Sequence, residues 1–178
     1  MNHESLWAPW RRAYLRDIER RLDAAGGPRG DASAGDFFAH YWRHPELDEI
    51  HHVIERDEHG MILLNRYPYA GGHLLVALGE ARPTLLDYES AQRGAFWRLV
   101  DRGADLVQRT LQPHGINIGI NQGSAAGAGV PEHLHAHLVP RWHADTNFIT
   151  SIAEIRVIPD ALERMASEYR AAAQGKRT

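Results

Sequence analysis

The sequence lacks cysteine altogether, since none occurs among its 178 residues. This absence excludes disulfide bonds, thiol catalysis and thiolate ligands for a metal. The sequence also lacks any apolar run that approaches the ~20 residues of a membrane-spanning helix. Its first residues mix tryptophan, proline and arginine, and so lack the basic-then-apolar order of a secretory signal. We therefore expect a cytoplasmic protein with no membrane partner.

An excess of one charge is also missing. The chain has 20 Lys and Arg against 23 Asp and Glu, which gives a net charge of −3 with neutral histidines. A general nucleic-acid binder would carry a basic surface, so we expect no nucleic-acid partner. The length and the hydrophobic fraction of 43% are typical of a single globular domain with its own core.

Histidine is abundant, in contrast, and the most improbable stretch of the chain is the run HLHAHLV at residues 133–139. In a β-strand successive side chains point to opposite faces, so the three imidazoles share one face and the apolar side chains take the other. Neutral imidazole acts as a nucleophile, a proton carrier and a metal ligand near pH 7. The row of His133, His135 and His137 therefore predicts a chemical site.

Two other interpretations of this row stay open, a purely structural role and a metal site. A zinc ion needs three or four ligands that converge on one point. Three histidines along one straight strand do not easily converge in this way. We therefore favour nucleophilic catalysis by histidine and assign no metal ligands to the triad.

Hydrophobic periodicity predicts several short strands, one long inserted helix and a C-terminal helix. Strands are expected over 52–56, 61–64, 73–78, 116–120 and 133–141, and helices over 6–24, 37–43, 84–111 and about 159–174. Residues 57–60 form the turn of a hairpin. This order indicates an α+β fold with a mainly antiparallel sheet of about five strands. We expect one domain, with an N-terminal extension (about 1–45), a core (about 50–150) and the C-terminal helix.

The spacing His-φ-His-φ-His-φ-φ, with φ apolar, resembles the signature of the histidine triad (HIT) nucleotide hydrolases and transferases at every position. Residues 64–76 resemble the upstream strand–turn–strand of that family, and residues 117–127 resemble its phosphate-side strand and loop. The stretches 6–11, 140–142 and 145–148 resemble the branch that acts on dinucleoside polyphosphates. The resemblance implies a HIT-like fold, in agreement with the predicted elements, and a homodimer.

The resemblance also assigns roles to four histidines. His135 would attack the α-phosphorus of a nucleotide and carry it as a covalent nucleotidyl-histidine. His137 would donate to a phosphate or leaving oxygen, and His133 would orient the site from the other side. His73 would support the triad by hydrogen bonding, although an ordinary strand-end histidine is an alternative interpretation of this residue.

The residues that the resemblance implies for substrate binding are Asn65, at the ribose position, and Asn121, Ser124, Gly127 and Gly129, near the phosphates. The loop over 123–129 is small and glycine-rich, so that its backbone N–H groups can approach phosphate closely. One departure concerns Gly129, because many family members have a glutamine four residues before the first histidine. Its absence puts the contacts to the leaving group in doubt.

Metal binding is a second point of comparison. Many bacterial relatives carry a Cys-x-x-Cys before the first core strand, and later histidines complete a zinc site. The comparable stretch here, residues 36–39, offers apolar packing instead. A site made only of histidines stays open, from His40, His44, His51 and His52. The histidine mechanism requires no cofactor, and magnesium can accompany a polyphosphate.

The implied activity is cleavage of a phosphoanhydride in dinucleoside polyphosphates, such as diadenosine tetraphosphate, with adenosine nucleotides as substrates. Water as the acceptor would give hydrolysis and inorganic phosphate would give phosphorolysis, and the sequence leaves both open. The alternatives are an adenosine phosphoramidase that acts on AMP conjugates and a nucleotide-binding regulatory protein with little turnover.

Overall fold

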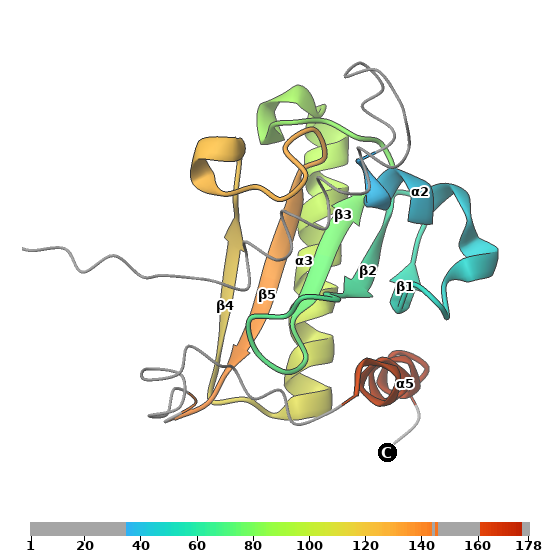
Figure 1. Cartoon of the computed structure of the whole chain (residues 1–178), viewed down its shortest axis with the longest axis vertical. Coiled ribbons are helices and arrows are strands. Elements are labelled where there is room, and N and C mark those ends of the chain that lie inside the picture. Colours follow the sequence, from blue (N-terminus) through green and yellow to red (C-terminus); the bar gives the residue numbers. More distant parts are fainter. Residues whose placement is uncertain (1–34, 144, 146–160, 176–178) are drawn as a thin grey trace, which may run out of the picture.

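The computed structural model describes residues 35–143, 145 and 161–175, which form five strands and three α-helices (Figure 1). The strands are β1 (Val53–Arg56), β2 (Gly60–Leu64), β3 (Leu74–Leu78), β4 (Gly115–Ile120) and β5 (His135–Arg141). The helices are α2 (Phe37–Arg43), α3 (Ser90–Leu111) and α5 (Leu162–Ala173). The helix expected over 6–24 and the stretch 146–148 lie outside the described residues.

All five strands belong to one open sheet, in the order β1-β2-β3-β5-β4, and each pair of neighbours is antiparallel. The long helix α3 is inserted between β3 and β4, so the chain leaves the centre of the sheet and returns to its edge. The α+β class, the five-stranded antiparallel sheet and both expected helices after the first strand are therefore confirmed.

The hairpin between β1 and β2 shows why the sequence turns where it does. The carboxylate of Asp57 accepts hydrogen bonds from the backbone N–H groups of His59 and Gly60, at 2.8 and 3.0 Å. Aspartate commonly stabilises turns in this way, because its carboxylate accepts from backbone N–H groups two or three residues ahead. The turn expected over 57–60 is confirmed.

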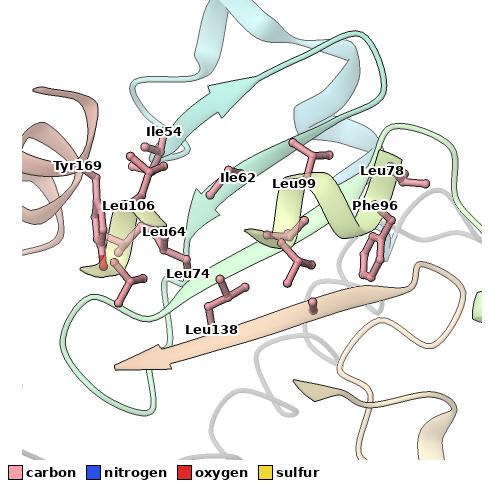
Figure 2. Close-up of a cluster of buried hydrophobic side chains, with 14 of the residues drawn as sticks. Ile54, Ile62, Leu64, Leu74, Leu78, Phe96, Leu99, Leu106, Leu138 and Tyr169 are labelled. Carbon is pink, nitrogen blue, oxygen red and sulfur yellow. The ribbon is translucent and has the colours of Figure 1, made fainter. Parts of the chain in front are cut away.

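The sheet buries a different cluster on each face. Helices α3 and α5 cover one face, and Figure 2 shows part of the larger cluster that they enclose. The triad strand contributes Leu134, Ala136 and Leu138 to this cluster, as the alternating pattern predicts. The opposite face carries a smaller cluster, of Phe38, Val53, Met61, Leu63, Leu75, Ala77 and Val130. The histidine side chains of β5 therefore lie on the face that α3 leaves uncovered.

The helix expected over 84–111 begins six residues later than predicted, at Ser90. Thr84 and Asp87 form a capping box around a single 3₁₀ turn, and Glu89 and Gln92 form a second one that starts α3. Tyr88 lies between the two boxes, is buried, and donates its hydroxyl to the carbonyl of Glu80 at 2.6 Å. Among the described residues, no helix is both long and apolar enough to cross a membrane.

Strand β5 also begins later than predicted, at His135 instead of His133. The N–H of Leu134 donates to the carbonyl of Arg82 at 2.8 Å, and the N–H of His133 donates to Val130 at 3.2 Å. These bonds to loop carbonyls replace the ladder bonds to β3. His133 therefore lies in the bend before the strand, although its ring stays on the same face as that of His135, because both contact Phe38.

Candidate active site

His135 and His137 lie side by side on the face of the sheet opposite to α3. On β3, His135 is paired with Ala77 and His137 with Leu75. On β4, His137 is paired with Gly119, where an added Cβ would meet no atom within 4 Å. One flank of the two histidines is thus packed against apolar side chains, whereas the β4 flank leaves space beside His137.

The hydrogen bond of His135 fixes its tautomer. Its Nδ1 lies 2.8 Å from the carbonyl oxygen of His133, and a carbonyl only accepts. Nδ1 therefore carries the proton, and the neutral ring keeps its lone pair on Nε2. Burial lowers the pKa of His135 below its ordinary value of 6.5, and this effect outweighs the hydrogen bond to the His133 carbonyl, which raises the pKa. The lone pair needed by a nucleophile is therefore present near neutral pH.

A second set of hydrogen bonds fixes the opposite tautomer in His137. The backbone N–H of Tyr69 donates to Nδ1 of His73 at 3.1 Å, so this nitrogen carries no proton. His73 must then be protonated on Nε2, which donates to Nδ1 of His137 at 3.1 Å. The remaining nitrogen of His137, Nε2, therefore carries the proton in the neutral ring. Tyr69 also stacks on His73, with ring centroids 4.9 Å apart.

The two rings thus offer complementary groups. The centroids of His135 and His137 are 5.0 Å apart, and the ring planes meet at 63°. His135 presents a lone pair on Nε2 and His137 presents an N–H on Nε2. An electrophile between them would meet a nucleophile from one ring and a hydrogen-bond donor from the other, as nucleophilic catalysis requires.

His133 differs from its two neighbours, because protein acceptors engage both of its ring nitrogens. Nε2 lies 2.7 Å from the carbonyl oxygen of Leu78, and Nδ1 lies 2.8 Å from the carboxylate of Asp36. The ring is fully buried and packs against Phe38, with centroids 5.1 Å apart. The contact of His133 with the reacting rings is made by its carbonyl, which accepts from His135.

Asp36 is a site residue that sequence reasoning misses, because residues 36–39 are predicted to offer apolar packing. A signal was present, because aspartate directly before a helical stretch is a preferred N-cap. Asp36 does cap α2, and its Oδ1 accepts from the N–H of Ala39 at 3.1 Å. Its second role, the contact with His133, joins residues 97 positions apart and has no local signal.

Asn65, expected at a ribose, is held by the turn that carries His73. Its Oδ1 accepts from the N–H of Tyr67 at 2.9 Å, which identifies the other amide atom as nitrogen. That nitrogen lies 3.2 Å from Nδ1 of His73. The structure therefore brings Asn65 to the support of the triad, and a contact with ribose stays a prediction.

The glycine-rich loop after β4 has an internal framework of its own. Gly123 and Gly127 both have positive φ, 82° and 89°, and flank a 3₁₀ turn that begins at Ser124. The N–H groups of Ala126 and Ala128 donate to the carbonyl of Gly123, and that of Gly127 donates to Ser124. These N–H groups have acceptors inside the loop, so phosphate binding by Ser124, Gly127 and Gly129 stays a prediction. The same holds for Asn121, one residue beyond the end of β4.

The histidines considered for a metal site gather only in part. The ring of His40 lies near those of His44 and His51, with centroids 4.6 and 5.7 Å away, and Tyr41 stacks on His51. Across the ranges that the structure describes, no group of three or more potential ligands is arranged to hold a metal ion.

Comparison with known proteins shows that the chain is similar to histidine triad proteins in sequence and in structure. The HIT domain family matches residues 47–144 of the chain. A Mycobacterium tuberculosis protein named AP-4-A phosphorylase is 38% identical over 164 residues, which cover 89% of this chain and 78% of that protein. A Schizosaccharomyces pombe protein named bis(5'-nucleosyl)-tetraphosphatase (asymmetrical) is 31% identical over 93 residues, 52% of this chain and 50% of its own length. The structure of a zinc-bound histidine triad family protein from Mycobacterium smegmatis aligns with a TM-score of 0.58 and 32% identity, over 69% of this chain and 84% of that one.

Proposed function

Because the chain belongs to the HIT domain family, we propose that it transfers a nucleotidyl group from a dinucleoside polyphosphate, such as diadenosine tetraphosphate, by way of His135. The observation that carries this proposal is the pair of opposite tautomers, a lone pair on Nε2 of His135 beside an N–H on Nε2 of His137. Relatives named for enzymes of diadenosine and dinucleoside tetraphosphates support the choice of substrate class.

The proposed first step uses both rings. Nε2 of His135 forms a bond to the α-phosphorus, and the bond from that phosphorus to the bridging oxygen breaks. The leaving nucleoside polyphosphate takes the electron pair of that bond and departs as an oxyanion, to which Nε2–H of His137 donates a hydrogen bond. His137 keeps its proton and stays neutral.

In the second step an unprotonated oxygen of the acceptor attacks the same phosphorus, and the phosphorus–nitrogen bond breaks to return the lone pair to His135. We propose inorganic phosphate as this acceptor, so that diadenosine tetraphosphate gives ADP and ATP. The support is that the relative named as a phosphorylase matches 89% of the chain, whereas the one named as a tetraphosphatase matches 52%. Water as the acceptor would instead give AMP and ATP.

The other expectations from the sequence enter the proposal as follows. Magnesium accompanies the phosphates of the substrate, since it prefers phosphate oxygens and water as ligands. The reaction takes place in the cytoplasm. The active form is a homodimer that joins two copies through β4 and α3, where Ile118 on the edge strand and Trp97 on the helix are 47% and 43% exposed.

The test is incubation of the pure protein with diadenosine tetraphosphate and magnesium, with and without inorganic phosphate, and separation of products by ion exchange. We expect ADP and ATP, and only when phosphate is present. His135→Ala is the control, and His135→Gly should also abolish covalent labelling by an α-³²P-labelled substrate.

Full activity in either His135 variant would contradict the role of this residue. Formation of AMP and ATP without phosphate would replace phosphate by water as the acceptor. If adenosine nucleotides bind but no product forms, the phosphoramidase and regulatory interpretations replace the proposal.

A further inference from the structure

A buried ion pair connects helix α2 with the bend before the triad strand. Asp36 and His133 are 5% and 0% exposed, and both carboxylate oxygens lie within hydrogen-bond distance of Nδ1 of His133, at 3.0 and 2.8 Å. Neither residue faces solvent, so the pair cannot itself take part in substrate binding. Buried ion pairs are costly to form unless every donor and acceptor is satisfied, which raises the question of what this one does.

The partners of the pair determine its protonation. Nε2 of His133 faces the carbonyl of Leu78 and must donate to it, whereas Nδ1 faces a carboxylate. Burial alone would raise the pKa of Asp36, but the hydrogen bond and the charge of His133 outweigh this effect and lower it. One N–H on Nε2, together with one proton in the hydrogen bond between Nδ1 and the carboxyl group, satisfies both contacts.

We propose that Asp36 is a positioning residue for the nucleophile: it anchors the ring of His133, and the backbone of the anchored His133 holds His135 in its reactive tautomer. This inference rests on the proposed function, because it assumes that His135 is the nucleophile. Asp36 itself touches none of the reacting atoms.

The link from Asp36 to the reaction runs through one peptide group. The carbonyl of His133 accepts Nδ1–H of His135 at 2.8 Å, and this bond leaves the lone pair on Nε2. His133 lies outside the β-ladder, so its peptide depends on anchors other than those of a strand. The ring is held at both nitrogens, and the chain on either side is held by bonds to Val130 and Arg82. Loss of the Asp36 bond would free one end of the ring and loosen the carbonyl.

Helix α2 is fixed well enough to serve as an anchor. Arg56 on β1 donates to the carbonyls of Tyr41 and Trp42 at the end of the helix, at 2.6 and 3.2 Å, and forms an ion pair with Asp48. Phe38 on the same helix packs against the rings of both His133 and His135. Arg56 therefore ties the C-terminal end of α2 to the sheet, and Asp36 lies at the N-terminal end of the same helix.

The experiment compares the full-length protein with Asp36→Asn. An asparagine oxygen can still cap α2, but its amide nitrogen would donate to Nδ1 of His133, which would then lose its proton. We expect the first step, measured as single-turnover formation of labelled protein, to slow by about 10-fold to 100-fold, the usual effect of removing a group that orients a reactive side chain. The KM should change much less than kcat.

Asp48→Asn is the matched control. It removes a carboxylate from the ion pair with Arg56, close to the same helix, without touching His133. We expect the rate of the first step to stay near that of the original protein in this variant, even if its Tm falls. An equal loss of rate in both variants would overturn the proposal in favour of a general effect on stability.

The ring nitrogens of His133 and His135 supply a readout that does not depend on activity. In ¹⁵N NMR spectra of the unsubstituted protein, the Nδ1 proton of His133 should show a strong hydrogen bond to the carboxylate of Asp36, and His135 should show a single tautomer, with its proton on Nδ1. The titratable groups that face the pair are His135 on β5 and Tyr88 before α3. Burial raises the pKa of Tyr88 to about 12, so Tyr88 stays neutral at the pH of the measurement.

Asp36→Asn should remove the Nδ1 proton of His133 and give His135 a mixture of its two neutral tautomers. A His135 that carries its proton on Nε2 in the unsubstituted protein would overturn the proposal without any variant. So would a single unchanged tautomer of His135 in folded Asp36→Asn. If the unsubstituted protein forms no products, nucleotidyl transfer fails as a function, while the NMR signals still decide whether Asp36 sets the state of the two rings.

Discussion

At the scale of single residues, two backbone groups determine the protonation of the reacting side chains. The carbonyl of His133 can only accept, and the N–H of Tyr69 can only donate. Through them His135 and His137 take opposite neutral tautomers. Because a backbone group does not titrate, this assignment persists wherever the rings are neutral.

The lowered pKa of His135 leads to a pH dependence of known sign. Protonation would occupy the Nε2 lone pair, and burial disfavours the charged ring, so protonation requires a pH below the ordinary value of 6.5. We expect kcat/KM, which reports the free enzyme, to stay level through pH 6.5 and to fall only in more acidic solution. The measurement is a profile of kcat/KM between about pH 5 and 8, with circular dichroism at each pH to exclude unfolding. An acid midpoint at or above 6.5 would contradict the burial argument.

Pattern and resemblance identify only the site residues whose roles leave a signal in the sequence. The alternation of histidines identifies His135 and His137, and the resemblance identifies His73 by its position after two glycines. Asp36 and Tyr69 have no such signal for their roles at the site. Asp36 acts across 97 positions, and Tyr69 acts through a backbone N–H that any residue but proline would supply.

At the scale of elements, the sequence predicts where helices and strands exist better than where they end. Strands β2 and β3 are short apolar runs, and the predicted start of each differs from the observed start by one residue. The start of α3 was missed because the apolar residues around Leu85 fit a helical period, although two successive capping boxes interrupt it. A capping box consists of reciprocal hydrogen bonds between the side chains and backbone N–H groups of two residues three positions apart. Hydrophobic periodicity does not detect such bonds.

The C-terminal end of α3 offers a test of capping. Gln112 takes a left-handed conformation there, with φ 46° and ψ 50°, which is strained for a residue with a Cβ. Gln112→Gly should remove this strain at some cost in the entropy of the unfolded chain, and should raise the free energy of unfolding by about 0.5–1 kcal/mol. Urea denaturation measures the change.

The control for that substitution is Gln108→Gly, because Gln108 is exposed in the interior of the same helix. Glycine there should lower the free energy of unfolding by about 1 kcal/mol. If both variants were destabilised to the same extent, the left-handed conformation of Gln112 would carry no strain.

At the scale of the whole molecule, the two faces of the sheet have different tasks. One face packs against α3 and α5 and holds the larger apolar cluster (Figure 2). The other face holds the histidines beneath α2, with the smaller cluster beside them. The strict alternation of β5 connects the two, because each histidine that reaches the site is next to an apolar residue that reaches the core.

The proposed homodimer can be tested at the edge of the sheet. Ile118 lies on the edge strand β4 and is 47% exposed. Ile118→Lys would place a charge in the proposed interface, and lysine on an edge strand opposes pairing with another strand. We expect light scattering after gel filtration to give the mass of one chain for this variant and of two chains for the original protein.

Ile50→Lys is the matched control, since Ile50 is 70% exposed and lies outside β4 and α3. Its mass should stay that of the original protein. A dimer that persists in Ile118→Lys, or a monomer without any substitution, would contradict this interface.

The contact between α5 and the turn before β3 bears on the order in which the protein acquires its site during synthesis. Tyr169, on the last helix, donates its hydroxyl to the carbonyl of Gly72 at 2.7 Å, across 97 positions, and Gly72 directly precedes His73. A ribosome makes the triad strand well before it makes α5, at roughly 5–20 residues per second. The nascent chain therefore contains its three triad histidines some seconds before Tyr169 is available to bind the turn that supports His73.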